Sequence, residues 1–214
     1  RRAFLSGGFA LGVAACTRNS SARAVNIAMG TWIGYGLALV ARDENLFDGI
    51  NLNVSIVDDG TALVSSLNSG QVDLIGTTLD QFVPLRANGM PAQLIMITDE
   101  SFGGDGIAAG PGINTLADLR GKKIAFVPGP SSEYVLAVAL RSVGISMDDV
   151  SPVPITDPSN AIGAFTSGEA DAICIYQPFL SQTTARQGAK LLCTTRDFPE
   201  VSMDKFHIHI LTAH

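Results

Sequence analysis

The chain has 214 residues, of which 46% are hydrophobic and 16% are charged, a composition typical of a globular protein and not of a disordered one. Its net charge is −6 and its lysines and arginines form no cluster, which argues against a nucleic-acid partner. The length suits one large domain or two small domains that each bury a core.

Residues 1–24 have the pattern of an export signal and a tether. Arg1 and Arg2 precede an apolar stretch that is too short to span a bilayer, and small residues then lead to Cys16. The pattern resembles a bacterial signal with a twin-arginine core and a lipobox, in which Cys16 becomes the lipid anchor. Simple cleavage after Ala24 is the alternative. Either reading predicts a periplasmic or other extracytoplasmic protein, and in the lipobox reading the protein contacts the membrane only through the lipid on Cys16.

Residues 25–102 are expected to form a first lobe in which strands alternate with helices. Apolar runs and helical spacing predict strands at 25–29, 51–57, 72–75 and 92–98 and helices at 35–47, 62–69 and 79–88. Leu37, Val40, Ala41 and Leu46 have the spacing of side chains that face a core. Thr61 is the expected N-cap of the second helix, and Gly70 is its expected C-terminal stop.

Residues 103–205 are expected to form a second lobe on the same plan. The glycine-rich stretch 99–112 precedes it, and we expect the hinge between the lobes at Gly103, Gly104, Asp105 and Gly106. Asn114 is the expected cap of a short helix. Strands are then predicted at 123–127, 151–155 and 171–176, helices at 132–143 and 159–167, and a last strand at 206–214 that returns to lobe one.

The two lobes are predicted from an internal repeat with a period of about 98 residues, which is too long for a solenoid unit. Residues 59–75 read DGTALVSSLNSGQVDLI and residues 157–173 read DPSNAIGAFTSGEADAI. Asp59 matches Asp157, and the pairs Ser69/Ser167, Gly70/Gly168, Asp73/Asp171 and Ile75/Ile173 are also identical. The repeat therefore indicates two similar α/β lobes with a cleft between them, where small ligands bind.

The loops that follow parallel strands are expected to face this cleft, because ligands bind beyond the carboxyl ends of such strands. Thr77 and Thr78 follow a strand in lobe one, and Ser131 and Ser132 do so in lobe two. Hydroxyls beside helix N-termini favour an anionic group such as a sulfonate, nitrate or carboxylate. A helix cap is the better explanation for any one of these hydroxyls alone, and it is the two pairs at matched positions that make ligand binding an equal alternative.

Aromatic side chains are the second expected feature of the cleft. Trp32, the single tryptophan, and Tyr35 lie in the glycine-flanked stretch GTWIGYG, and Tyr176 ends a strand of lobe two, so the three are expected to form an aromatic wall. A place in the core is the alternative for Trp32. Asp59 and Asp157 follow strands. A turn role is favoured for both, with ligand contact to an amine or hydroxyl as the alternative.

Several segments together resemble the solute-binding proteins of ABC importers for nitrate, sulfonates and taurine, a group that also includes thiamine-pyrimidine (NMT1/THI5-like) binders. They are GTWIGYGLALVARDENLF, DDGTALVSSLNSGQVDLIGTTLDQF, SFGGDGIAA, NTLADLRGKKIAF and TSGEADAICIYQPFL, and the resemblance covers residues 25–213. It implies a type II periplasmic-binding-protein fold whose lobes close on a small ligand and deliver it to a membrane permease. The positions that match the family's cleft loops are Trp32, Tyr35, Thr77, Thr78, Ser131, Ser132, Tyr134, Asp157, Tyr176 and Gln177. Members of the family usually continue beyond the point where this chain ends, so we expect a C-terminally truncated chain.

A binding protein without catalysis, metal or cofactor, acting as a monomer, is the leading reading. A pyrimidine-precursor binder is the alternative ligand class, and a thiamine-pyrimidine synthase is the enzyme alternative. That enzyme would use histidine and a lysine-bound cofactor, but all histidines of this chain lie in residues 207–214, outside the cleft loops. His207 and His209 are better read as one face of a strand than as metal ligands. The effector domain of a transcription regulator is excluded by the export signal.

Cys174 and Cys193 are interpreted as two buried thiols. A disulfide between them is left open, because their spacing alone does not decide it.

Overall fold

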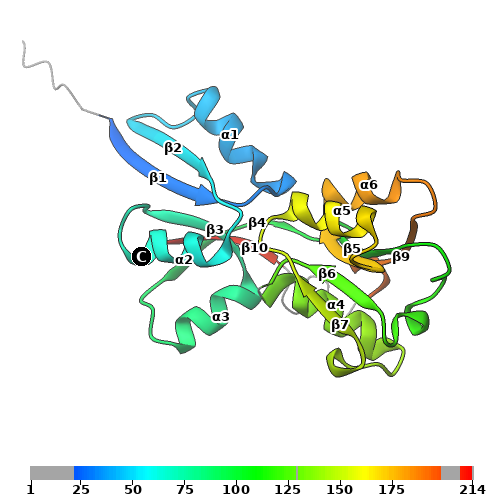
Figure 1. Ribbon diagram of the computed structural model, residues 1–214. Coiled ribbons are helices and arrows are strands. Elements are labelled where there is room, and N and C mark those ends of the chain that lie inside the picture. Colours follow the sequence, from blue (N-terminus) through cyan, green and yellow to red (C-terminus); the bar gives the residue numbers. More distant parts are fainter. Residues whose placement is uncertain (1–21, 129, 199–207, 214) are drawn as a thin grey trace, which may run out of the picture.

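The computed structural model describes residues 22–128, 130–198 and 208–213. The predicted lipid anchor Cys16 and most of the predicted leader lie outside these residues. The described chain forms two five-stranded sheets, each flanked by helices, which we call lobe one and lobe two (Figure 1). The α/β organisation in two lobes is confirmed.

Lobe one contains the sheet with the strand order β2-β1-β3-β10-β4. Strands β1, β2 and β3 are parallel, and β10 runs antiparallel to both of its neighbours. The strands are β1 (Arg23–Met29), β2 (Ile50–Ile56), β3 (Leu74–Thr78), β4 (Gln93–Glu100) and β10 (Ile208–Ala213). The helices are the 3-10 turn η1 (Ile33–Tyr35), α1 (Gly36–Asp43), α2 (Gly60–Asn68) and α3 (Leu79–Ala87).

Lobe two contains the sheet with the strand order β7-β6-β8-β5-β9. Strand β6 is parallel to β7 and β8, and β5 is antiparallel to β8 and β9. The strands are β5 (Asp105–Ala109), β6 (Lys123–Phe126), β7 (Ser151–Pro154), β8 (Ala172–Tyr176) and β9 (Lys190–Thr194). The helices are α4 (Pro130–Ser142), α5 (Pro158–Ser167), α6 (Phe179–Thr184) and the 3-10 turns η2 (Leu116–Leu119), η3 (Met147–Asp149) and η4 (Thr195–Asp197).

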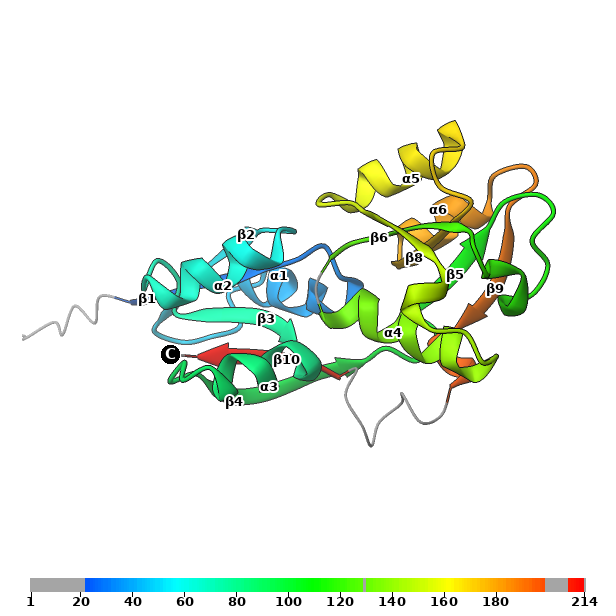
Figure 2. The same ribbon diagram turned by 60° about the horizontal axis from the view of Figure 1, so that its bottom comes forward.

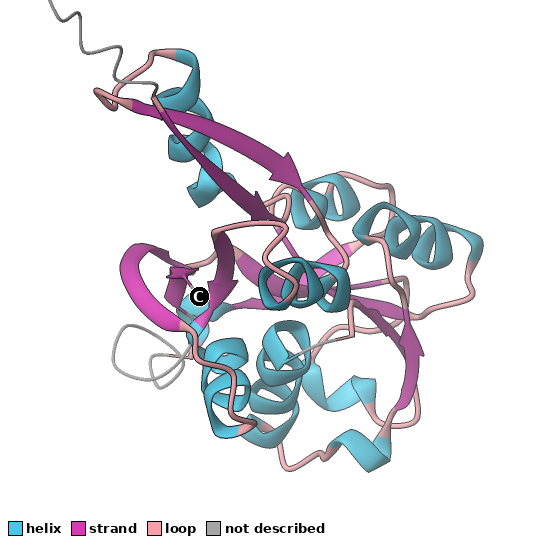
Figure 3. Cartoon of the chain, turned by 90° about the vertical axis from the view of Figure 1, so that its left-hand side faces the viewer, coloured by secondary structure: helices cyan, strands magenta, loops and turns pink. Residues whose placement is uncertain are grey.

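The two sheets have the same topology, as the repeat predicts. Strands β2-β1-β3 correspond to β7-β6-β8, and each set is extended by an antiparallel strand that the chain contributes after leaving the other sheet. The chain crosses from β4 to β5 through residues 101–104 and comes back as β10, which lies between β3 and β4 (Figure 2). Figure 3 shows helices in cyan lying beside the strands in magenta.

The repeated residues hold the backbone of each lobe. Asp59 is the N-cap of α2 and accepts a hydrogen bond from the Ala62 amide at 2.7 Å, while Asp157 caps α5 through the Ser159 amide at 2.8 Å. The prediction that Thr61 is the N-cap of α2 is wrong, because α2 begins at Gly60 and Thr61 is already inside the helix.

The helix ends and the following loops are also repeated. Gly70 and Gly168 follow α2 and α5 with φ values of 71° and 79°, a left-handed conformation that glycine adopts without strain. Asp73 and Asp171 then accept hydrogen bonds from the backbone amides of Asn26 and Lys123, each at 2.8 Å. Each of these carboxylates therefore holds a loop against the middle one of the three parallel strands of its sheet, β1 or β6.

Two other predictions about local structure are wrong. The short helix η2 is capped by Thr115, which forms a capping box with Asp118, so Asn114 is not its cap. In lobe one, Leu37 on α1 is 71% exposed and Val40 and Leu46 are also exposed, so the apolar stripe of this segment does not face a core.

The two cysteines of lobe two are buried free thiols. Cys174 on β8 and Cys193 on β9 both pair with Ile107 of β5, which lies between them. Residues two strands apart are separated by about 9.5 Å, whereas a disulfide needs Cα atoms within about 7 Å. The register therefore excludes a disulfide, and burial raises the pKa of the Cys193 thiol to about 12.

Candidate ligand-binding cleft

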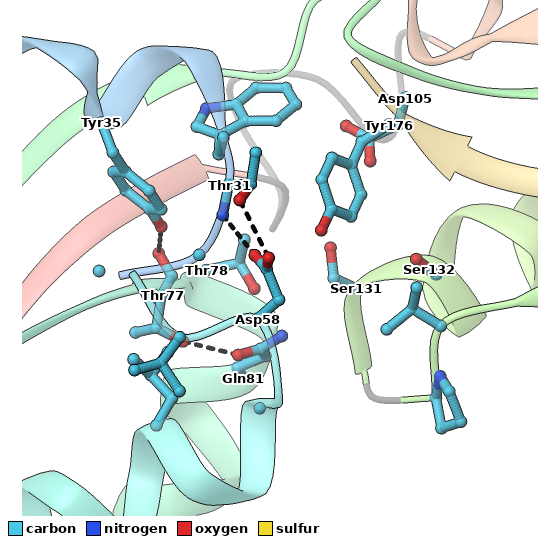
Figure 4. Close-up of a pocket in the computed structure, with 18 residues that line it drawn as sticks. Thr31, Tyr35, Asp58, Thr77, Thr78, Gln81, Asp105, Ser131, Ser132 and Tyr176 are labelled. Atoms are coloured by element: carbon cyan, nitrogen blue, oxygen red, sulfur yellow. Dashed lines mark hydrogen bonds between the residues drawn. The ribbon is translucent and has the colours of Figure 1, made fainter. Parts of the chain in front are cut away.

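A cavity of about 110 Å³ lies between the two lobes, at the carboxyl ends of the parallel strands. It is smaller than the pockets of about 300–1,000 Å³ that hold drug-sized ligands, so its size suits a small solute. Figure 4 shows side chains of lobe one facing those of lobe two across it. The lining residues used below are Thr31, Trp32, Tyr35, Asp58, Thr77, Thr78, Gln81, Asp105, Ser131, Ser132 and Tyr176.

The lobe-one wall is built from the loops after β1 and β2. Asp58 lies in the loop that follows β2, and its carboxylate accepts hydrogen bonds from the Thr31 amide at 2.5 Å and from the Thr31 hydroxyl at 3.0 Å. Both oxygens of Asp58 are thereby fixed in place by the loop that also carries Trp32. This pair joins the ends of two neighbouring parallel strands at the rim of the cavity.

The end of β3 contributes two threonines with different partners. The Thr77 hydroxyl donates to Gln81 Oε1 at 2.7 Å, and the Thr77 carbonyl accepts from the Tyr35 hydroxyl at 3.0 Å. Thr78 is the N-cap residue of α3, but its side chain does not cap the helix. Thr78 is only 4% exposed, and its hydroxyl has no hydrogen-bond partner among the described residues. A buried unpaired hydroxyl is destabilising, so its place on the cavity wall points to a partner in the ligand or in bound water.

Aromatic rings meet across the cavity. The Trp32 indole Nε1 donates to Asp99 at 3.0 Å, and its ring packs edge-on against Tyr176 of lobe two, with centroids 6.1 Å apart. Burial is the largest cause of a pKa of Tyr35 well above its ordinary value, and the Asp99 charge adds to it. The Tyr176 hydroxyl also has a raised pKa, first through burial and then through the Asp58 charge. Both tyrosines therefore remain neutral hydrogen-bonding groups at physiological pH.

The lobe-two wall is formed by the first turn of α4 and the start of β5. Ser131 and Ser132 lie in that first turn, and Ser132 is 5% exposed. Asp105, the first residue of β5, is buried and accepts a short hydrogen bond from the Ser101 hydroxyl. Thr195 accepts a hydrogen bond from the Gly103 amide at 2.8 Å, so lobe two holds the crossing segment 101–104.

The structure brings most of the predicted site residues together. Trp32, Tyr35, Thr77, Thr78, Ser131, Ser132 and Tyr176 all line the cavity. The other predicted residues do not, because Asp59 and Asp157 cap helices, Tyr134 packs against the core of lobe two, and the Gln177 side chain accepts from the Ser181 amide in α6.

Asp58, Thr31 and Gln81 line the cavity but are absent from the predicted set. Asp58 lies beside Asp59, and the repeat favours Asp59 because only Asp59 recurs in lobe two. Its place in the loop after β2 is the signal that points to Asp58, since loops at the carboxyl ends of parallel strands face the cleft.

The predicted hinge residues occupy two kinds of position. Gly103 and Gly104 lie in the crossing segment, whereas Asp105 and Gly106 already pair with β8 as part of β5. A Cβ atom on Gly104 would lie 2.4 Å from Trp32 Cη2, so the crossing packs directly on the cavity's tryptophan. The hinge motion itself stays a prediction.

The described residues contain no group of three or more His, Cys, Asp or Glu side chains arranged to hold a metal ion. None of the helices described combines the length and hydrophobicity that a membrane span requires.

Comparison with known proteins gives relatives of one kind. An Escherichia coli (strain K12) protein whose name describes aliphatic sulfonates binding is 34% identical over 137 residues, 62% of this chain and 42% of that protein. The taurine-binding periplasmic protein of the same organism is 24% identical over 160 residues, 73% of this chain and 50% of that protein. The chain thus spans half or less of the length of these relatives.

Solved structures agree on the fold. The alkanesulfonate-binding protein SsuA from Xanthomonas axonopodis pv. citri, bound to MOPS, superposes with a TM-score of 0.76 at 24% identity, covering 89% of this chain and 65% of that chain. This likeness confirms the predicted type II periplasmic-binding-protein fold. The model of the family described as NMT1/THI5 like matches residues 34–209, which is most of the chain, so the chain belongs to that family.

Proposed function

We propose that this protein is an extracytoplasmic solute-binding protein that captures a small sulfonate-type solute and delivers it to the permease of an ABC importer. The observation that carries the proposal is the placement of hydrogen-bonding side chains from both lobes around one small cavity. The relatives named for sulfonates and taurine support the ligand class. We further propose a monomer that is anchored to the membrane through Cys16.

Binding and closure are one equilibrium in this proposal. Thr78 offers its hydroxyl from lobe one, and Ser132 lies opposite in the first turn of α4. A solute that contacts both residues favours the closed arrangement, because a ligand shifts a conformational equilibrium only through different affinities for the two states. In this proposal the lobes rotate about the crossing segment 101–104.

Catalysis is not part of the proposal. The cavity is lined by hydroxyls, two carboxylates and aromatic rings, and no histidine or lysine is among its described lining residues. A thiamine-pyrimidine synthase of the predicted kind would need such groups at the ligand. The geometry therefore favours binding over the enzyme alternative.

The test uses Thr78→Ala and Ser132→Ala, singly and together, with Ser142→Ala as a control at the other end of α4. We expect each cleft variant to weaken sulfonate binding by about 1–3 kcal/mol, the cost of leaving a buried partner unpaired, and the control to bind as the wild type does. Calorimetry measures affinity and small-angle scattering measures compaction. If only one lobe's variant weakens binding, or if the ligand causes no compaction, the two-lobe mechanism is wrong.

Trp32 provides an independent readout of the same site. Because its ring packs against Tyr176 across the cavity, closure on a ligand is expected to change its fluorescence. An unchanged spectrum, with binding established by calorimetry, would place Trp32 outside the ligand's surroundings.

A further inference from the structure

The charged side chains that line the cavity are all acidic. Asp58 and Asp105 line it, and no Lys, Arg or His occurs among the described residues that do. A third carboxylate, that of Asp99, accepts a hydrogen bond from the indole of Trp32, which itself lines the cavity. A site with carboxylates on its wall and no cation repels a solute whose only charge is negative. Among the predicted solutes, this wall therefore disfavours those that carry only negative charge, such as nitrate.

Asp58 is the carboxylate best placed to bind a ligand. Each of its oxygens accepts one hydrogen bond from Thr31, and a carboxylate has about four acceptor positions. The ion pairs within the described residues join Arg42 to Asp43 and Arg120 to Asp149, so Asp58 is neutralised by neither. Figure 4 shows its side chain facing Tyr176 and Ser131 across the cavity. A partly buried carboxylate without a cation gains most from a positively charged ligand group.

Thr78 gives a second, independent indication that a ligand occupies this side of the cavity. Its hydroxyl is buried on the wall and lacks a partner among the described residues. Figure 4 shows it on the same wall as Asp58. A polar ligand group next to Asp58 would satisfy both side chains.

The opposite wall has the opposite preference. Ser131 and Ser132 lie in the first turn of the long helix α4, where backbone amides and the helix dipole favour negative charge. The cavity is thus polarised, with acceptors at Asp58 and donors at α4. A solute with one charge of each sign can satisfy both walls at once.

We propose that the captured solute is zwitterionic and that Asp58 binds its protonated amine while α4 binds its anionic end. This inference rests on the proposed function and narrows it to amino-sulfonates and related amino acids. Solutes that carry only a negative charge, such as simple alkanesulfonates and nitrate, bind more weakly.

The experiment compares two sulfonates of the same size, taurine and isethionate, in which a hydroxyl replaces the amine. Calorimetry is carried out on the wild type, on Asp58→Asn, and on Asp59→Asn as the matched control, because the neighbouring Asp59 caps α2 outside the cavity and asparagine retains the cap. We expect the wild type to bind taurine about 10- to 100-fold more tightly than isethionate, the value of one charge-assisted hydrogen bond.

The variants separate the two proposals. Asp58→Asn is expected to remove most of the preference for taurine, and Asp59→Asn to keep it. Isethionate binding as tightly as taurine in the wild type, or Asp58→Asn weakening both sulfonates equally, overturns the zwitterion inference and leaves the proposed function standing. Failure of the wild type to bind either sulfonate contradicts the proposed function and this inference with it.

Discussion

Lobe one and lobe two have the same strand order, but the buried apolar clusters formed by their described residues differ in size. In lobe two, alternate residues of β8 enter two separate buried clusters, with Cys174 on one face of the sheet and Ile173 on the other. In lobe one the buried cluster is small and centres on Leu67 and Ile75. Strand β4 is exposed on both faces, at Leu94, Ile95, Met96 and Ile97.

This difference shows that two lobes with the same backbone topology need not be equally stable. The caps, the left-handed glycines and the loop carboxylates recur in both lobes, yet burial depends on what packs over each sheet. Because burial of apolar surface is the main favourable term in folding, lobe two is expected to provide most of the stability of this chain.

The largest effect on the free energy of unfolding is expected when an isoleucine is replaced in each lobe. Ile173→Ala removes a side chain that is 0% exposed, and we expect it to lower the free energy of unfolding by about 2–5 kcal/mol. Ile97→Ala removes one that is 59% exposed on β4, and we expect a loss below about 1 kcal/mol. Urea unfolding followed by circular dichroism measures both. Equal losses would mean that β4 is covered in solution and that the contrast between the lobes is not intrinsic.

A smaller effect is expected at a repeat position where lobe one has a glycine and lobe two has a larger side chain. Gly76 on β3 corresponds to Cys174 on β8, and a Cβ on Gly76 would lie 2.8 Å from Tyr35 Cζ and 2.9 Å from Met29 Cβ. Gly76→Ala should therefore cost about 1–3 kcal/mol through overpacking, whereas Cys174→Ala should cost about 1 kcal/mol through the small void that it leaves. Should Gly76→Ala be neutral in urea unfolding, Tyr35 is not packed as tightly on β3 as the geometry indicates.

The comparison also explains which parts of the molecule were predictable. The repeat predicts the topology of both sheets, because the identical residues are structural, as the paired caps Asp59 and Asp157 and the paired loop carboxylates Asp73 and Asp171 demonstrate. For the same reason, the identical residues of the repeat do not identify the residues that line the cavity.

These cavity-lining positions lie where the two copies differ. Asp58 has Thr156 as its counterpart, and Thr78 has Tyr176. Thr78 and Tyr176 were predictable because they end strands and carry polar or aromatic groups. The exposure of the apolar stripe of α1 was not, because a helical pattern indicates which face is apolar but not whether a neighbour covers it.

The smallest predicted effect concerns acid. In lobe two, hydrogen bonds hold the pKa of three capping carboxyls below their ordinary value: Asp118 through the Asn114 amide first, Asp149 through the Ser146 amide, and Asp157 through the Ser159 hydroxyl. A carboxyl whose pKa is lower in the folded state contributes stability that is fully present above its unfolded pKa of about 4 and is lost as the pH falls through the folded pKa.

Acidification from about pH 5 to about pH 3 should therefore loosen the capped helices of lobe two. The variant Asp157→Asn keeps a capping acceptor at the start of α5 but no longer titrates. We expect its melting temperature to fall less than that of the wild type over this pH range, and hydrogen exchange to show the difference in α5 peptides. Because these caps are exposed, the effect per residue is small. An equal fall in both proteins would mean that the Asp157 charge adds nothing to the cap, and that the acid sensitivity of lobe two comes from elsewhere.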